Sequence, residues 1–200
     1  MTALILAGGR GSRMGGVDKG LQIFRGLPLA QHALFRLRAQ AGEECAVAIN
    51  ANRNLSTYAA WGVPVWPDIT KSDLGPLAGF ATGLQLCTTP WLLTVPCDTP
   101  LFPLNLAQRL MTAATERRAD IVMAAAPQED GNVRTQPVFC LMHTRVGPSL
   151  TAFLESGQRK IDRWTELHAT EIVSFDGPTD DRRAFFNLNT LAELQALENP

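Results

Sequence analysis

ALILAGGRGSRMGGVDK occupies residues 3–19 and joins a short apolar run to a glycine-rich loop. Glycine fills five of the nine positions 8–16, so the backbone can take positive φ and consecutive N–H groups can converge on an anion. Arg13 and Lys19 add positive charge at the rim of the loop. Residues 3–7 are predicted to form a buried strand, so the loop follows its carboxyl end. Open α/β sheets bind their ligands at the carboxyl ends of strands. We therefore predict a site for nucleotide phosphates.

Two better-known phosphate loops do not fit this stretch. A P-loop ends in Gly-Lys-Ser/Thr, whereas Gly16 is followed by Val17 and Asp18. A dinucleotide-binding loop has the spacing Gly-x-Gly-x-x-Gly and an acidic residue at the end of the second strand, and the second expected strand here ends in Asn50. A plain turn is the remaining alternative, but a turn needs neither five glycines nor two cations.

Length and composition exclude several classes of protein. The chain has 200 residues, 46% of them hydrophobic, which is enough for a substantial core. Its net charge of −1 leaves no overall electrostatic attraction to nucleic acid or to an anionic membrane. We find neither a signal sequence nor a membrane helix, and we expect a cytoplasmic protein. The four cysteines, Cys45, Cys87, Cys97 and Cys140, lack metal-site spacing, so we expect reduced core thiols.

Apolar periodicity predicts alternating strands and helices. Strands are expected at residues 3–7, 46–49, 63–66, 92–95, 121–125, 138–141 and 171–175. Helices are expected at residues 28–42, 76–86, 104–117, 145–155, 160–167 and 191–197, with a short helix between the second and third strands. Residues 127–135 are expected to form a long loop or hairpin.

This alternation predicts an α/β fold. Strands that are apolar throughout are typical of a mostly parallel sheet covered by helices on both faces, a Rossmann-like α/β/α arrangement. Because no linker or low-complexity tract interrupts the chain, we expect residues 1–200 to form one domain.

Polar residues that follow the expected strands are the candidates for chemistry. Asp98 comes just after a buried strand, and a lone carboxylate facing a triphosphate suffices for Mg²⁺; capping a turn before Pro100 is its alternative role. Lys19 and Arg13 would neutralise the phosphates, unless they are solvated surface cations. Asn50 and Asp68 also follow strands, and each also fits a turn.

Four segments of the chain, in order, resemble the nucleotidyltransferases, and most closely the molybdenum cofactor guanylyltransferase family. They are LAGGRGSRMGGVDK at residues 6–19, NANR at residues 50–53, GPLAG at residues 75–79 and PCDTP at residues 96–100. The resemblance implies a fold like that of the nucleotide-diphospho-sugar transferases, with a nucleotide-binding N-terminal half and an acceptor-binding C-terminal half. Mixed strands are expected late in the chain.

The resemblance also implies a reaction. Family members transfer GMP from GTP to molybdenum-bearing molybdopterin, with Mg²⁺ as cofactor and Mn²⁺ as an alternative, and release pyrophosphate. GTP and molybdenum-molybdopterin are thus the implied substrates. Molybdoenzymes, their chaperones and other cofactor-biosynthesis proteins are the implied partners, with no nucleic acid and no membrane among them.

The family motifs assign roles to residues of this chain. The implied catalytic residues are Lys19, Arg13 and Asp98, and Asp98 is the implied metal ligand. The implied nucleotide-binding residues are Leu6, Ala7, Gly8, Gly9, Lys19, Asn50, Asp68, Gly75, Gly79 and Asp98. The implied acceptor-binding residues are Gln136, Arg159, Asn187 and Asn189.

Several alternatives stay open at this point. Asp68, the loop backbone and the turn at residues 75–79 are competing candidates for reading the base. Gly79 could instead allow close packing of its helix, and Arg159 could lie on a solvated helix face. Asn189 could form a local helix cap together with Thr190 and Glu193. A CTP-dependent or sugar-phosphate nucleotidyltransferase is the alternative enzyme, and a non-catalytic GTP-binding delivery module is the alternative of another class.

Overall fold

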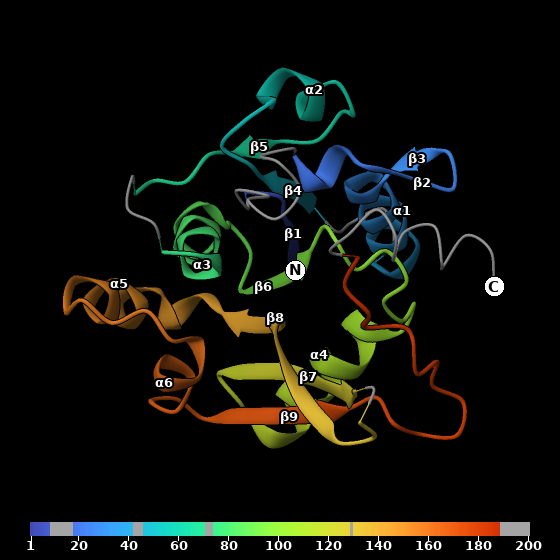
Figure 1. The fold of residues 1–200 in the computed structure, drawn as a ribbon. Coiled ribbons are helices and arrows are strands. Elements are labelled where there is room, and N and C mark those ends of the chain that lie inside the picture. The colour runs from blue at the N-terminus through green and yellow to red at the C-terminus, as the bar shows by residue number, and fades with distance from the viewer. Residues whose placement is uncertain (9–17, 42–45, 71–73, 129, 189–200) are drawn as a thin grey trace.

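A seven-stranded sheet forms the centre of the computed structural model, which describes residues 1–8, 18–41, 46–70, 74–128 and 130–188 (Figure 1). The strand order across the sheet is β5-β4-β1-β6-β8-β7-β9. Their bounds are β1 (Thr2–Leu6), β4 (Ala46–Asn50), β5 (Val65–Trp66), β6 (Trp91–Pro96), β7 (Ile121–Pro127), β8 (Val133–His143) and β9 (Thr170–Ser174).

The first half of the sheet is parallel. β1 pairs with β4 on one side and with β6 on the other, and β4 pairs with β5. The chain moves outward from β1 through α1 (Leu29–Ala41) to β4 and through α2 (Leu55–Ala59) to β5, and then returns through α3 (Pro76–Leu86) to β6. The direction of travel reverses at β1. The carboxyl ends of β1 and β6 therefore lie at the switch point of the sheet, the place where open α/β sheets bind ligands.

The second half of the sheet is mixed. β8 runs antiparallel to both β6 and β7, and β9 runs parallel to β7. The turn between β7 and β8 is closed by a hydrogen bond from Gln128 N to Asn132 O (2.9 Å). The expected loop or hairpin at residues 127–135 is thus confirmed as a hairpin.

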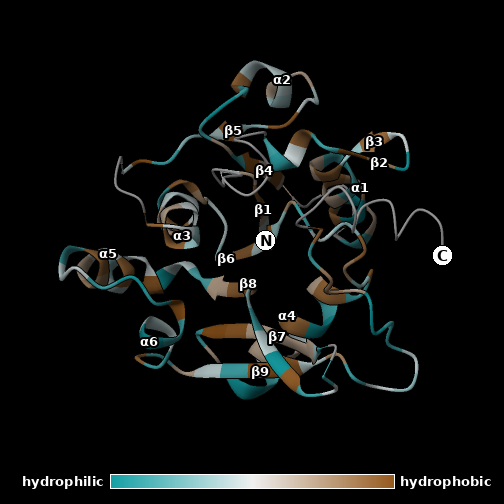
Figure 2. Ribbon diagram, in the orientation of Figure 1, coloured by the Kyte–Doolittle hydropathy of each residue, from teal (hydrophilic) through white to brown (hydrophobic). Residues whose placement is uncertain are grey.

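Helices cover both faces of the sheet, as Figure 1 shows. Successive strand residues point to opposite faces, so Ala3 and Ile5 of β1 join the core beneath α1 and α4 (Leu106–Arg117), while Leu4 joins the core beneath α3. The second core also contains residues of α5 (Gly147–Glu155) and α6 (Ile161–Thr165). Burial on both faces explains why the central strands β1, β6 and β7 are apolar, whereas the edge strand β9 is partly exposed and Figure 2 shows it in mixed colours.

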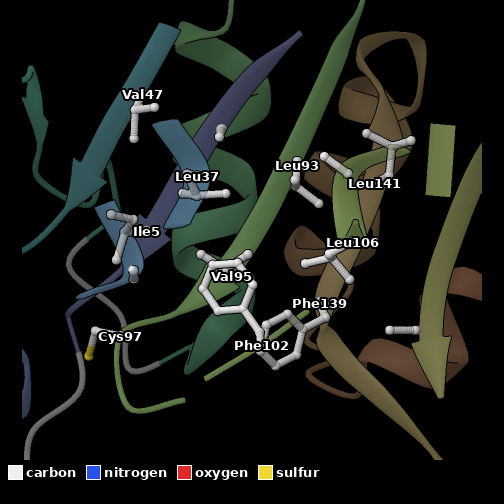
Figure 3. Close-up of a cluster of buried hydrophobic side chains, with 14 of the residues drawn as sticks. Ile5, Leu37, Val47, Leu93, Val95, Cys97, Phe102, Leu106, Phe139 and Leu141 are labelled. Carbon is white, nitrogen blue, oxygen red and sulfur yellow. The ribbon is translucent and has the colours of Figure 1, made fainter. Parts of the chain in front are cut away.

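The larger core is centred on β1, β6 and β8 (Figure 3). Leu93 and Leu141 lie opposite each other in the β6–β8 ladder, and both are fully buried. The Phe102 and Phe139 rings pack with their centroids 5.7 Å apart. This packing joins the parallel half of the sheet to the mixed half.

Most of the predicted elements are confirmed, and the fold class is α/β as expected. α3 has the predicted bounds, and α1 and α4 differ from prediction by one or two residues at an end. The third strand is shorter than predicted, since β5 has only two residues, and the 138–141 strand is longer, since β8 has eleven. The predicted helix at residues 191–197 lies outside the described residues.

A small two-stranded element was not predicted from the sequence. β2 (Ile23–Phe24) and β3 (Leu27–Pro28) form a separate two-stranded hairpin. Arg25 and Gly26, its two turn residues, both have positive φ, as expected of a tight hairpin turn. Phe24 is buried in a small cluster with Leu29 and Leu188, so the hairpin supports the C-terminal segment. Strands of two residues are too short to show an apolar period.

Among the described residues, no helix has the length and hydropathy needed to cross a membrane.

Truncating the centre of the larger core should destabilise the fold strongly. We expect Leu93→Ala to lower the free energy of unfolding by about 2–5 kcal/mol, because it removes buried methyl groups and leaves a cavity. Leu104→Ala is the matched control, since that side chain is 56% exposed, and should cost less than about 1 kcal/mol. Urea denaturation of both variants is the measurement. Equal losses would contradict this assignment of the core.

Candidate active site

Three strands deliver polar residues to the same edge of the sheet. Backbone hydrogen bonds from Ala7 N to Asn50 O (2.8 Å) and from Cys97 N to Leu6 O (3.2 Å) continue the pairing beyond the last residues of β1 and β6. This pairing fixes the positions of Asn50, Gly8 and Asp98 relative to one another. The carboxyl ends of β1, β4 and β6 therefore meet at one edge of the sheet, at the switch point.

Lys19 and Asp98 form an ion pair at this edge. Lys19 Nζ lies 2.8 Å from Asp98 Oδ2, which is the separation of a charge-assisted hydrogen bond. The two side chains are 20% and 18% exposed, so the pair is partly shielded from water and still reachable from it. Lys19 begins the 3-10 turn η2 (Lys19–Leu21), whereas Asp98 follows β6. The structure thus brings together two residues that the sequence analysis had proposed separately.

Asp18, which the sequence analysis did not single out, anchors the turn that carries Lys19. Its side chain is almost fully buried, and it accepts hydrogen bonds from three groups. Gly20 N and the Tyr58 hydroxyl donate to Oδ1 at 3.1 and 2.7 Å, and Asn54 Nδ2 donates to Oδ2 at 2.9 Å. Burial, and then the hydrogen bond to Asp18, raise the pKa of Tyr58 above its ordinary value, so its hydroxyl stays protonated and donates.

Gly20 lets Tyr58 reach Asp18. A Cβ atom at position 20 would lie 2.4 Å from the Tyr58 hydroxyl oxygen, which is closer than real Cβ contacts. Tyr58 comes from α2 and is the only tyrosine in the chain. The glycine therefore has a packing reason that is independent of any ligand.

Asn50 and Asn52 hold the Asp68 carboxylate from both sides. Asn50 Nδ2 donates to Oδ1 at 2.8 Å, and Asn52 Nδ2 donates to Oδ2 at 2.7 Å. The Asp68 backbone N–H returns a bond of 2.9 Å to Asn52 Oδ1. Each carboxylate oxygen can accept two bonds, so Asp68 keeps acceptor capacity while its orientation is fixed. The structure thus brings Asn50 and Asp68 together, and Asn52 is a further member that the NANR motif contained.

Gly79 of α3 allows Asn50 to sit close to the helix. A Cβ atom at Gly79 would lie 2.7 Å from both Asn50 Oδ1 and Leu6 Cδ2. The close-packing interpretation of Gly79 is therefore supported. Gly75, the residue before α3, has a φ of +56°, and it places the start of the helix beside the same edge.

The C-terminal segment reaches the site at Asp98. Leu188 N donates to Asp98 O at 2.8 Å, and the buried Thr99 hydroxyl donates to Asn187 Oδ1 at 2.6 Å. Asn187 is thereby brought next to the Lys19–Asp98 pair. Arg109 of α4 supports the same segment from further away, since it donates to Asp180 Oδ1 at 2.8 Å.

The remaining predicted residues are less closely connected. Gln136 pairs with Ala124 in the part of β8 that extends beyond the end of β6, on the same edge as Asp98. Arg159 lies in the exposed connection between α5 and α6, and donates to the carbonyl oxygens of Leu154 and Gln158. These bonds give it no connection to the Lys19–Asp98 pair. The predictions for Gly9, Arg13 and Asn189 fall outside the described residues.

Cys97 is not placed to act as a nucleophile. Its side chain is buried, and burial together with the neighbouring Asp98 charge raises the pKa of the thiol well above its ordinary value. The thiol is therefore neutral and belongs to the core. Cys140 is likewise buried and Cys87 is partly buried; all three lack a disulfide, and Cys45 lies outside the described residues.

We predict that Asn187→Ala lowers the free energy of unfolding more than Thr99→Val does. The first change leaves a buried hydroxyl without its acceptor, at a cost of about 1–3 kcal/mol, whereas the second replaces that hydroxyl with a methyl group of similar shape. Urea denaturation measures both losses, and faster hydrogen exchange at the Leu188 amide should accompany the larger one. A greater loss in Thr99→Val would argue against the contact.

Comparisons with known proteins point to one family. The model of the MobA-like NTP transferase domain matches residues 3–171. A molybdenum cofactor guanylyltransferase of Acidovorax ebreus is 64% identical over 99% of this chain and 95% of its own length. One from Bordetella petrii is 59% identical over 98% and 96%.

Solved structures agree on the fold. Molybdopterin-guanine dinucleotide biosynthesis protein A of Archaeoglobus fulgidus superposes with a TM-score of 0.77 at 17% identity, covering 99% of this chain and 97% of its own. The 2-C-methyl-D-erythritol 4-phosphate cytidylyltransferase of Thermus thermophilus has a TM-score of 0.71 at 13% identity, covering 98% and 96%. The expected nucleotide-diphospho-sugar transferase fold is confirmed. On its sequence and its family match, this chain belongs to the MobA-like NTP transferase family, among the molybdenum cofactor guanylyltransferases.

Proposed function

We propose that this protein transfers GMP from GTP to molybdenum-bearing molybdopterin, forming the molybdopterin guanine dinucleotide cofactor and pyrophosphate. Membership of the guanylyltransferase family over nearly the whole chain supports the reaction class and the nucleotide. Within this chain, the main support for the proposal is the Lys19–Asp98 ion pair at the switch point between β1 and β6.

The chemistry needs positioning and charge stabilisation more than proton transfer. An oxygen of the acceptor's terminal phosphate attacks the α-phosphorus of GTP. The bond between that phosphorus and the bridging oxygen to the β-phosphorus breaks, and its electron pair leaves with pyrophosphate. The attacking phosphate is ionised at neutral pH, so no general base is required. Lys19 would offset the negative charge that builds up on the phosphates, and the glycine-rich loop would donate N–H groups to them.

Asp98 is the residue that would hold Mg²⁺, with Mn²⁺ as a substitute. The donor set fits, because magnesium takes one or two carboxylates and completes its shell with phosphate oxygens and water. Among the described residues no hydrogen-bond donor contacts Asp98 Oδ1, so that oxygen is available while Lys19 holds Oδ2. When bound, the metal supplies positive charge to the phosphate oxygens.

Asp68 is the residue we propose for recognising the guanine base. A carboxylate can accept from both the N1–H and the 2-amino group of guanine, and a site built in this way rejects bases that lack these donors. Asn50 and Asn52 support this role because they fix the carboxylate and leave part of its acceptor capacity.

The acceptor is assigned to the C-terminal half of a single domain. Gln136 and Asn187 lie on the edge that carries Asp98, which favours them over Arg159 as contacts for the pterin phosphate. We further propose a cytoplasmic protein that hands its product to molybdoenzymes, to their chaperones or to other cofactor-biosynthesis proteins. The free thiols of Cys87, Cys97 and Cys140 are in keeping with a reducing compartment.

Pyrophosphate release from separate GTP, CTP, ATP and UTP reactions, with molybdopterin and Mg²⁺, tests the proposal. We expect release from GTP alone and its loss when a chelator removes the metal. Release from CTP would support the same mechanism but would show that the base is cytosine and not guanine. GTP binding without turnover of any nucleotide would favour the delivery module.

We predict that Asp98→Ala abolishes turnover, with a loss of at least about a hundredfold in kcat, because it removes the proposed metal ligand and the partner of Lys19. Asp162→Ala on α6 is the matched control, since it removes an exposed carboxylate away from this edge, and should retain wild-type activity. Steady-state kinetics at saturating Mg²⁺ is the measurement. An Asp98→Ala enzyme that keeps most of its activity would exclude the metal role.

A further inference from the structure

Asp18, Tyr58 and Asn54 form a hydrogen-bonded group next to the turn that carries Lys19. This group has no part in the reaction described so far. Tyr58 is fully buried, and its hydroxyl donates to Asp18 Oδ1 at 2.7 Å. Asn54, directly before α2, donates to the other carboxylate oxygen at 2.9 Å. A five-residue helix between β4 and β5 thus reaches back 40 residues along the chain to the end of the glycine-rich loop.

The arrangement is energetically demanding. Asp18 is 7% exposed, and the three groups that donate to its carboxylate within the described residues are all neutral. A buried carboxylate is costly unless its oxygens are satisfied, so removing one donor leaves part of a charge without compensation. The hydrogen bonds therefore fix Asp18 firmly relative to α2.

Fixing Asp18 also fixes Lys19. The Asp18 side chain accepts from Gly20 N, and its carbonyl oxygen accepts from Leu21 N at 3.2 Å, so Asp18 both caps η2 and closes its first turn. Lys19 lies between these two contacts, and its ammonium extends to Asp98 on the opposite side. A continuous series of contacts leads from Tyr58 through Asp18 to the ammonium group.

We propose that Tyr58 is a positioning residue for Lys19: through Asp18 it holds η2 so that the Lys19 ammonium stays where the nucleotide phosphates bind. The inference rests on the proposed function, since it assigns Lys19 to the phosphates. It gives a second purpose to α2, whose buried residue Tyr58 also packs in the larger core.

A purely structural role makes a different prediction. If Tyr58 only stabilises the fold, its hydroxyl changes the free energy of unfolding and leaves the affinity of the folded protein for nucleotide unchanged. If it positions Lys19, losing the hydroxyl weakens nucleotide binding, and the weakening disappears once Lys19 is replaced.

The experiment is a double-mutant cycle of Tyr58→Phe and Lys19→Met on the dissociation constant of Mg²⁺–GTP, measured by calorimetry at a temperature where all variants are folded. Tyr58→Phe keeps the ring that packs edge-on against Trp61 at 5.1 Å and removes only the hydroxyl. We expect it to weaken binding by about three- to tenfold in the wild-type background and by less than twofold in the Lys19→Met background. Pyrophosphate release by Tyr58→Phe should fall at least as much.

Two further variants complete the test. Thr165→Val is the matched control, because it removes another buried hydroxyl, one that donates to Asp162 O in α6, and it should bind Mg²⁺–GTP like the wild type. Asn54→Gly serves if Tyr58→Phe does not fold: glycine keeps the left-handed backbone of position 54 (φ 51°) while removing the amide, and it should reproduce the weakened binding.

The outcomes separate the inference from the function on which it rests. Wild-type affinity in Tyr58→Phe and Asn54→Gly, or an equal loss in both Lys19 backgrounds, would overturn the positioning role while leaving the guanylyltransferase proposal in place. A wild-type protein that binds no GTP would overturn the proposed function and the inference with it.

Discussion

The contact between the Lys19 ammonium and the Asp98 carboxylate depends on nearly every other feature of the fold. The two residues are 79 positions apart, and they meet because β1 and β6 pair side by side although four other strands, β2 to β5, lie between them in sequence. One residue follows the glycine-rich loop and the other follows a buried strand. The sheet, its crossover at β1 and the packing of both cores therefore act together to hold one cation against one anion.

The fold was largely predictable because the apolar pattern of the strands and helices has one consistent interpretation. The run at residues 3–7 has no polar alternation, and it lies between two helical layers that bury Ile5 on one face and Leu4 on the other. The helix that begins at Pro76 was predicted at both ends, since proline is favoured in a first turn. The β2–β3 hairpin was missed because four residues give too little pattern, and its stability comes from Phe24 packing against a segment more than 160 positions away.

The site was predictable only in part, and the difference has a physical reason. Lys19, Asn50, Asp68 and Asp98 follow strands or the loop, so strand direction alone places them on one edge. Their supporting partners carry no such signal, because a hydrogen bond between Asp18 and Tyr58, or between Thr99 and Asn187, depends on tertiary packing. The one available clue was indirect: a single tyrosine in a short helix, and a glycine right after Lys19 that leaves room for it.

Two carboxylates act on Lys19 in different ways: Asp18 holds the backbone of the turn that carries Lys19, and Asp98 pairs with its ammonium group. Asp18 is deeply buried, and three neutral donors hold both of its oxygens, so moving it would leave a buried charge uncompensated. Asp98 is more exposed, and within the described part of the chain only Lys19 donates to its carboxylate, from the end of a flexible side chain. Separating that pair exposes both charges to water or to phosphate and metal, at a much smaller cost. The first carboxylate can therefore fix the turn, while the second is the one that can exchange its partner when a nucleotide binds.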